Sequence, residues 1–142
     1  MTTPTPRQTA LLDQVHASVT HARSVLTTVV DEHGGTRIPI PAWLQPHTDT
    51  LMAAVTDGTV TGCPHLWAVA QVLHAAVWAP GHIACSWCAT ALNPPPGEDH
   101  TCDRCRKPAS RLTNGAVAVG PILLGFGICR PCLTTTRKET PR

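Results

Sequence analysis

The sequence has few aromatic residues and no long hydrophobic segment. Its 142 residues include four Trp, one Phe and no Tyr, so aromatic residues make up only 4% of the chain. Its apolar residues are largely Ala, Val and Leu, and such small side chains bury little area each. We therefore expect a modest core that cross-linking by a metal would help to stabilise. No apolar run reaches about 18 residues, so we expect no membrane-spanning helix.

The N-terminal sequence also lacks the features of a secretory signal. It contains no apolar core and no cleavage site of small residues. We therefore expect an intracellular, cytoplasmic protein. In a reducing compartment disulfides are rare, and paired cysteines indicate metal binding or redox chemistry.

Motifs of the common catalytic classes are missing too. The sequence has no His-Glu-x-x-His, no Gly-x-Ser-x-Gly, no phosphate-binding glycine loop and no His-x-Glu of the kind found in zinc deaminases. A catalytic zinc also needs an open coordination position, and the ligand pattern described next leaves none. We therefore predict that the protein is not an enzyme.

Seven cysteines and one nearby histidine form a pattern typical of zinc binding. Six cysteines lie in three Cys-x-x-Cys pairs, and the seventh lies in a Cys-Pro-His sequence. A structural zinc takes four such ligands in a tetrahedron, so eight ligands complete two sites and leave no cysteine over. His82 is the alternative to His65. The predicted ligands are Cys63, His65, Cys85, Cys88, Cys102, Cys105, Cys129 and Cys132.

Three assignments of these ligands to two metals are open. The sequential assignment, which we favour, places the first four ligands on one metal and the last four on the other. In a second assignment the pairs that begin at Cys85 and Cys102 share a metal, and in a third alternate pairs do so. We expect two Zn²⁺ ions; an iron–sulfur cluster is the alternative cofactor, because cysteine quartets hold both.

Apolar periodicity and turn residues predict an α+β fold with a helical N-terminal part. We expect helices over residues 7–33, 41–56 and 66–78, the last of them buried, and a hairpin of strands over 110–119 and 122–128. The Pro-rich segment 93–100 is the best internal boundary. The predicted parts are a disordered arm (1–6), a helical region with the first zinc site (7–92), a linker-like turn (93–100) and a basic zinc-binding module with its tail (101–142).

The C-terminal cysteines carry a resemblance to known zinc fingers. The sequences TCDRC and GICRPC resemble the knuckles of zinc ribbons and treble clefs, over about residues 101–135 and at the level of fold class. The resemblance implies a zinc-stabilised β-hairpin whose second cysteine pair opens a short helix.

Charge is distributed unevenly along the chain. Residues 1–100 carry three bases and seven acids, a balance of −4, whereas residues 101–142 carry eight bases and two acids, a balance of +6. We therefore predict a regulatory, DNA-binding or otherwise nucleic-acid-binding module, associated with transcription or a similar process. The candidate contacts are Arg104, Arg106, Lys107, Arg111 and Arg130.

Alternative functions remain open at this point. Basic residues near a cysteine pair also offset the −2 charge of a zinc bound by four thiolates, so their presence does not require a nucleic-acid ligand. The protein could instead be a protein-interaction adaptor whose two zinc sites are purely structural. A zinc-thiolate redox switch is a further alternative. The expected partners are nucleic acid or another protein, and the long N-terminal helix could pair with a second copy instead of packing on its own domain.

Overall fold

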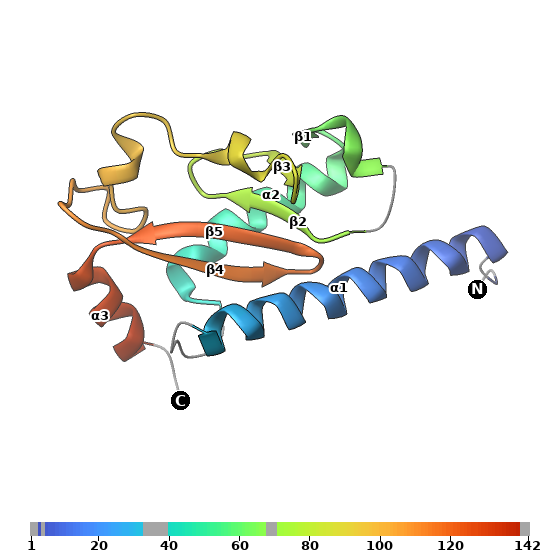
Figure 1. Cartoon of the computed structure of the whole chain (residues 1–142), viewed down its shortest axis with the longest axis horizontal. Helices are drawn as coiled ribbons and strands as arrows, with labels where there is room; N and C mark the ends of the chain where they lie inside the picture. Colours follow the sequence, from blue (N-terminus) through green and yellow to red (C-terminus); the bar gives the residue numbers. More distant parts are fainter. Residues whose placement is uncertain (1–2, 4, 33–39, 68–70, 140–142) are drawn as a thin grey trace.

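A mixed five-stranded sheet forms the centre of the molecule (Figure 1). The computed structural model describes residues 3, 5–32, 40–67 and 71–139. In chain order the elements are α1 (Pro6–Glu32), η1 (Ala42–Leu44), α2 (Gln45–Asp57), β1 (Thr61–Gly62), η2 (Pro64–Trp67), β2 (Leu73–Ala76), β3 (His82–Cys85), η3 (Ala89–Leu92), η4 (Glu98–His100), β4 (Thr113–Val119), β5 (Ile122–Ile128) and α3 (Arg130–Glu139).

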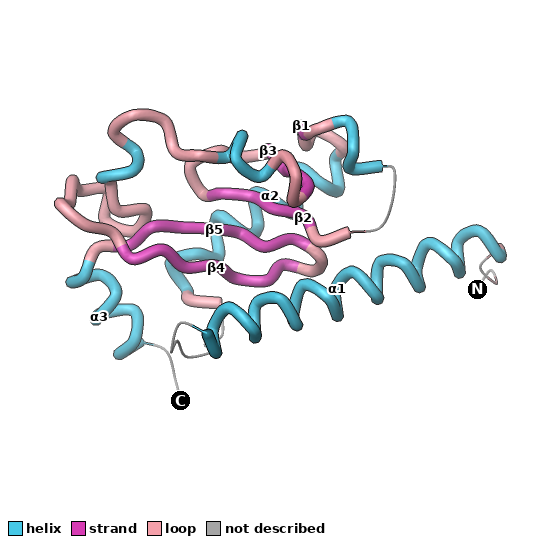
Figure 2. The backbone as a smooth tube through the Cα atoms, viewed as in Figure 1, coloured by secondary structure: helices cyan, strands magenta, loops and turns pink. Residues whose placement is uncertain are grey.

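The strands lie in the order β1-β3-β2-β5-β4, so β2 is the central strand (Figure 2). It runs antiparallel to β3 and parallel to β5, and β4 and β5 form an antiparallel hairpin. The short edge strand β1 runs parallel to β3. The sheet therefore combines strands that come before and after residues 93–100; the proposed domain boundaries themselves stay a prediction.

Helices cover both faces of the sheet. On one face, Leu44 and Leu51, from η1 and α2, pack with alternate residues of β5 such as Leu124 in the main core. On the other face, Val25 of α1 packs on a smaller cluster that contains Leu123. Figure 1 shows that the N-terminal half of α1 continues beyond the sheet. Within the described part of the chain, no helix has the length and hydropathy needed to cross a membrane.

Most local predictions are confirmed. The α+β class holds, the first two helices occur at α1 and α2, and the hairpin occurs at β4 and β5. Gly120 adopts a positive φ of 59° in the hairpin turn, a conformation that suits glycine. Residues 1, 2 and 4 of the predicted arm, and residue 33 at the end of the first predicted helix, lie outside the described residues.

The predicted helix over residues 66–78 is wrong. A short 3-10 turn, η2, ends at Trp67, and the apolar run continues as strand β2 and a turn that contains Trp78. The physical reason is that β2 is the central strand, with apolar clusters on both faces of the sheet. A strand buried on both faces shows an unbroken apolar run instead of alternation, so periodicity alone does not distinguish it from a buried helix.

An aromatic pair joins the main core to the second cysteine cluster. Phe126 of β5 stacks edge-on against Trp43, with ring centroids 5.3 Å apart, and both residues border the core around Ile128 and Cys102 as well as the main core. Gly115 of β4 lies directly opposite Phe126 in the hairpin register. A Cβ at Gly115 would overlap the phenyl ring.

We predict that Gly115→Ala destabilises the protein by about 1–3 kcal/mol, because the phenyl ring would have to move away from Trp43 in a packed core. Urea unfolding of the metal-loaded protein measures this change. Ala116→Ser, at the neighbouring exposed position, is the control and should change the free energy of unfolding by less than about 0.5 kcal/mol. Equal stability of Gly115→Ala and wild type would contradict the packing described for Phe126.

Candidate metal centres

The first cluster combines ligands from two separate segments. Cys63 precedes η2 and His65 lies in it, whereas Cys85 ends β3 and Cys88 follows in a tight turn. In that turn the Cys88 amide donates a hydrogen bond to the Cys85 carbonyl at 3.0 Å. Pairing of β1 with β3 brings the two segments together, and the four potential ligand atoms lie within 4.8 Å of one another.

The second cluster lies where β5 meets α3. Cys102 and Cys105 form a turn in which the Arg106 amide donates to the Cys102 carbonyl at 2.9 Å. Cys129 follows β5 directly, and Cys132 lies in the first turn of α3. These four sulfur atoms also lie within 4.8 Å of one another. The structure thus groups the eight predicted ligands as in the sequential assignment.

Distances within both clusters suit a tetrahedral zinc. Zinc–sulfur bonds of about 2.3 Å place two thiolates of a tetrahedron about 3.8 Å apart, and a sulfur and an imidazole nitrogen about 3.6 Å apart. The Cys105 and Cys129 sulfurs are 3.9 Å apart. His65 Nδ1 lies 3.7 Å from the Cys85 sulfur and 3.4 Å from the Cys88 sulfur. Both donor sets therefore fit a tetrahedral metal site with four protein ligands.

Backbone amides support one sulfur in each cluster in the same way. The Cys85 amide donates to the Cys63 sulfur at 3.5 Å, and the Cys129 amide donates to the Cys102 sulfur at 3.4 Å. In each case the amide of the third ligand in the chain reaches the sulfur of the first. Such hydrogen bonds stabilise thiolates and orient metal ligands.

Hydrogen bonds, burial and neighbouring thiols shift the pKa values of four of these cysteines, two downward and two upward. The hydrogen bond from the Cys85 amide, supported by His65, lowers the pKa of Cys63 to about 6. Burial opposes ionisation of Cys102, but hydrogen bonds from three backbone amides outweigh it and lower that pKa to about 7. Burial and neighbouring thiols raise the pKa of Cys88 to about 11 and that of Cys132 to about 12. Because neighbouring thiols oppose one another's ionisation, a divalent cation is the partner that lets all of them ionise together.

The two other histidines near the first cluster have different contacts. His82 begins β3, and its Nδ1 lies 2.8 Å from the Thr61 hydroxyl oxygen. His74 lies in β2, where its Nε2 is 3.1 Å from the Ser86 hydroxyl oxygen and burial lowers its pKa. In the described part of the chain, neither belongs to a group of potential metal ligands, so His65 is the histidine that the fold places among the cysteines.

Two of the predicted nucleic-acid contacts form ion pairs within the fold. Arg104 donates to Glu139 at 2.8 Å and to the Thr136 hydroxyl at 2.7 Å. These bonds attach the end of α3 to the turn of residues 102–105, called the knuckle below. Arg106 binds both carboxylate oxygens of Glu98, at 2.8 and 3.2 Å. The hydrogen bonds from these arginines hold the pKa values of both glutamates below their usual range. Both guanidinium groups are thus engaged by carboxylates.

The other three predicted contacts, Lys107, Arg111 and Arg130, have exposed side chains. Sequence reasoning did not single out Arg137 and Lys138, which are also exposed, in the last turn of α3. Their position about two helical turns after Arg130, on the short helix that the zinc-finger resemblance implies, was the available signal. Over the described residues, none of these five side chains forms an ion pair or a hydrogen bond.

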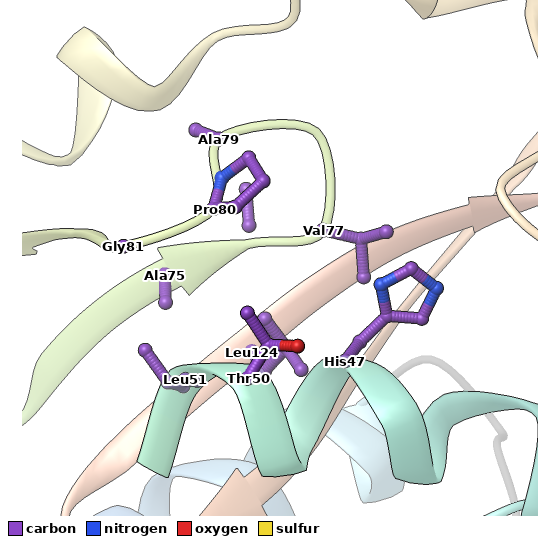
Figure 3. Close-up of a pocket in the computed structure, with 10 residues that line it drawn as sticks. His47, Thr50, Leu51, Ala75, Val77, Ala79, Pro80, Gly81 and Leu124 are labelled. Carbon is purple, nitrogen blue, oxygen red and sulfur yellow. The ribbon is translucent and has the colours of Figure 1, made fainter. Parts of the chain in front are cut away.

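A small cavity lies apart from both clusters, between α2 and the turn after β2 (Figure 3). Its volume is about 130 Å³, and its lining includes His47, Leu51, Ala79 and Pro80. Pockets for small molecules usually measure about 300–1,000 Å³, and no cysteine borders this cavity. We therefore assign it no cofactor.

No known protein family, curated protein or solved structure matches the chain. Its function therefore has to be inferred from the two clusters and the surface around them.

We predict that native protein contains two zinc ions per chain and negligible iron, because both donor sets are soft, closed and tetrahedral. Cys102→Ser should remove one zinc and leave the first cluster loaded. Elemental analysis of both proteins checks this, together with the absence of iron–sulfur absorption. A variant that loses both metals would show that the sites are not independent.

We predict that His65→Ala weakens zinc binding at the first cluster by at least about tenfold. Loss of a residue that only hydrogen-bonds a metal ligand typically lowers metal affinity by about 10–100-fold, and loss of a ligand itself should cost at least as much. His82→Ala is the matched control, because it removes an imidazole whose hydrogen-bond partner among the described residues is the Thr61 hydroxyl. Competition with a chromophoric chelator measures both affinities. A larger effect of the His82 substitution would show that His82, and not His65, is the metal ligand.

Proposed function

We propose that the protein is a non-enzymatic zinc protein that binds nucleic acid through its C-terminal basic part. The observation that carries this proposal is the pairing of charges in residues 101–139. Asp103 and Glu139, the acids of this segment, lie in ion pairs with Arg106 and Arg104. The five exposed bases therefore have no acid of the segment left to neutralise them, and they are Lys107, Arg111, Arg130, Arg137 and Lys138.

The ion pairs also separate two roles that basic residues can have near a zinc site. Arg104 and Arg106 adjoin the knuckle and offset the negative charge of its thiolates and carboxylates. The other five bases project from a framework that Cys102, Cys105, Cys129 and Cys132 hold together. Exposed bases on such a framework can neutralise phosphates and release counterions, which favours binding to any nucleic acid.

The resemblance of residues 101–135 to zinc ribbons and treble clefs fits the same proposal. The hairpin β4–β5 leads into Cys129, and α3 begins within the second cysteine pair. A DNA-linked process such as transcription is the setting we infer for such a module. The acidic N-terminal part would repel the same polyanion, so we expect modest affinity without strong sequence preference.

A protein-interaction adaptor is the second candidate function, and Trp87 favours it. Its side chain is 91% exposed in the turn between Cys85 and Cys88. No Asp, Glu, Lys or Arg lies between Asp57 and Glu98. The centres of protein interfaces are depleted in charge and enriched in Trp, so this end of the molecule suits a protein partner better than a polyanion. Pairing of two copies through α1 belongs to the same alternative.

We predict that the zinc-loaded full chain binds duplex DNA with an affinity that falls steeply with salt. Four or five phosphate contacts give a slope of about −4 in a plot of log affinity against log salt concentration, because each contact releases about 0.9 counterions. Fluorescence anisotropy with a labelled duplex, between about 50 and 200 mM salt, measures the slope.

The control is a variant with Trp87→Ser, which removes the most exposed large apolar residue of the described part of the chain and no charge. This variant should bind DNA as the wild type does. Absence of binding to both DNA and RNA at the lowest salt would refute the nucleic-acid proposal and leave the adaptor.

A further inference from the structure

Helix α3 carries on its exposed side three bases that form no ion pair with any residue the structure describes. Arg130, Arg137 and Lys138 are all exposed, and at 3.6 residues per turn they fall within an arc of about 100° around the helix. The exposed Thr134 lies inside the same arc. Thr136, at 3% exposure, and Leu133 lie toward the second cluster instead. The helix therefore has one face that packs and one face that is cationic.

Contacts at both ends hold this helix in a fixed orientation. At its N-terminal end, Cys129 and Cys132 belong to the second metal cluster. At its C-terminal end, Arg104 bonds both Thr136 and Glu139. Figure 1 shows α3 at the end of the sheet where β5 finishes, projecting from the strands. A partner that approaches this end meets the cationic face without any rearrangement of the fold.

The dimensions of this face match one kind of nucleic acid. Arg130 and Arg137 are seven residues apart, which is about 10 Å along the helix axis and about three base pairs of a duplex. With its side chains an α-helix is about 10–12 Å wide, and the major groove of B-DNA, about 12 Å wide, admits it. The major groove of duplex RNA is too narrow and deep for side chains to read.

We propose that α3 docks in the major groove of duplex DNA, with Arg130, Arg137 and Lys138 contacting phosphates at the groove edges. This inference rests on the proposed nucleic-acid binding and assigns it to one helix and one form of nucleic acid. Thr134 and Thr135 donate their hydroxyl hydrogens to carbonyls one turn earlier, at 3.1 Å. Those hydrogens are thus satisfied within the helix, which agrees with binding that depends on phosphates more than on base sequence.

The test compares two double variants that remove the same charge from the full zinc-loaded chain. Arg137→Gln with Lys138→Gln removes two bases from α3, whereas Lys107→Gln with Arg111→Gln removes two exposed bases outside it. Arg130 is left intact because it lies between two cysteine ligands. The α3 variant should bind duplex DNA more than about tenfold more weakly at 0.1 M salt and flatten the salt slope by about 1.8. The other variant should change both quantities less.

Further measurements make the outcome decisive. Zinc content and circular dichroism of both variants should equal those of wild type, and Arg137→Lys with Lys138→Arg should retain binding. Wild type should prefer duplex DNA to duplex RNA and to a single strand of the same sequence. Binding that depends equally on both pairs of bases, or that favours RNA or single strands, would overturn the assignment to α3 while the proposed function stands. No binding by wild type to any of the three would overturn both.

Discussion

The parallel pairing of β2 with β5 is the constraint on which the remaining structure depends. It places a strand from the middle of the chain beside the C-terminal hairpin, with Leu73 opposite Ile122 and Ala76 opposite Gly125. Through β2, strand β3 and the first cysteine cluster join the same sheet. The two clusters consequently lie at opposite ends of that sheet, because Cys85 aligns with the start of β2 whereas Cys129 follows the end of β5.

Local sequence patterns were enough to predict the elements that depend on neighbouring residues. Periodicity located α1 and α2, turn residues separated the two strands of the hairpin, and cysteine spacing identified the groups that the fold brings together. Strand β2 was not predictable in this way, because its character depends on neighbours that are distant in sequence. The ion pairs of Arg104 and Arg106 were missed because counting charges treats each base as free. For Arg104 the partner, Glu139, also lies 35 residues away in the sequence.

The same ion pairs change how the charge of the C-terminal part is understood. A net excess of bases by itself does not distinguish structural cations from cations that are available to a ligand. Arg104 connects the knuckle to α3, and Arg106 connects it to the segment before Thr101 through Glu98. The proposed contacts with nucleic acid therefore come from bases that the fold does not use. At the other end of the sheet, Trp87 is exposed within a stretch of sequence, residues 58–97, that contains no Asp, Glu, Lys or Arg, which suits a different kind of partner.

The position of the clusters at opposite ends of the sheet makes β5 a spacer of fixed length. About seven strand residues, or roughly 23 Å, separate the level of Cys85 from Cys129. The Debye length at physiological salt is about 8 Å, so the charge state of one cluster has little influence on ion uptake at the other across solvent. Any cooperativity between the two metals would have to travel as strain through the hydrogen-bonded backbone of β2 and β5. A titration of the chain with metal should therefore show two sites that bind independently, although both belong to the same sheet.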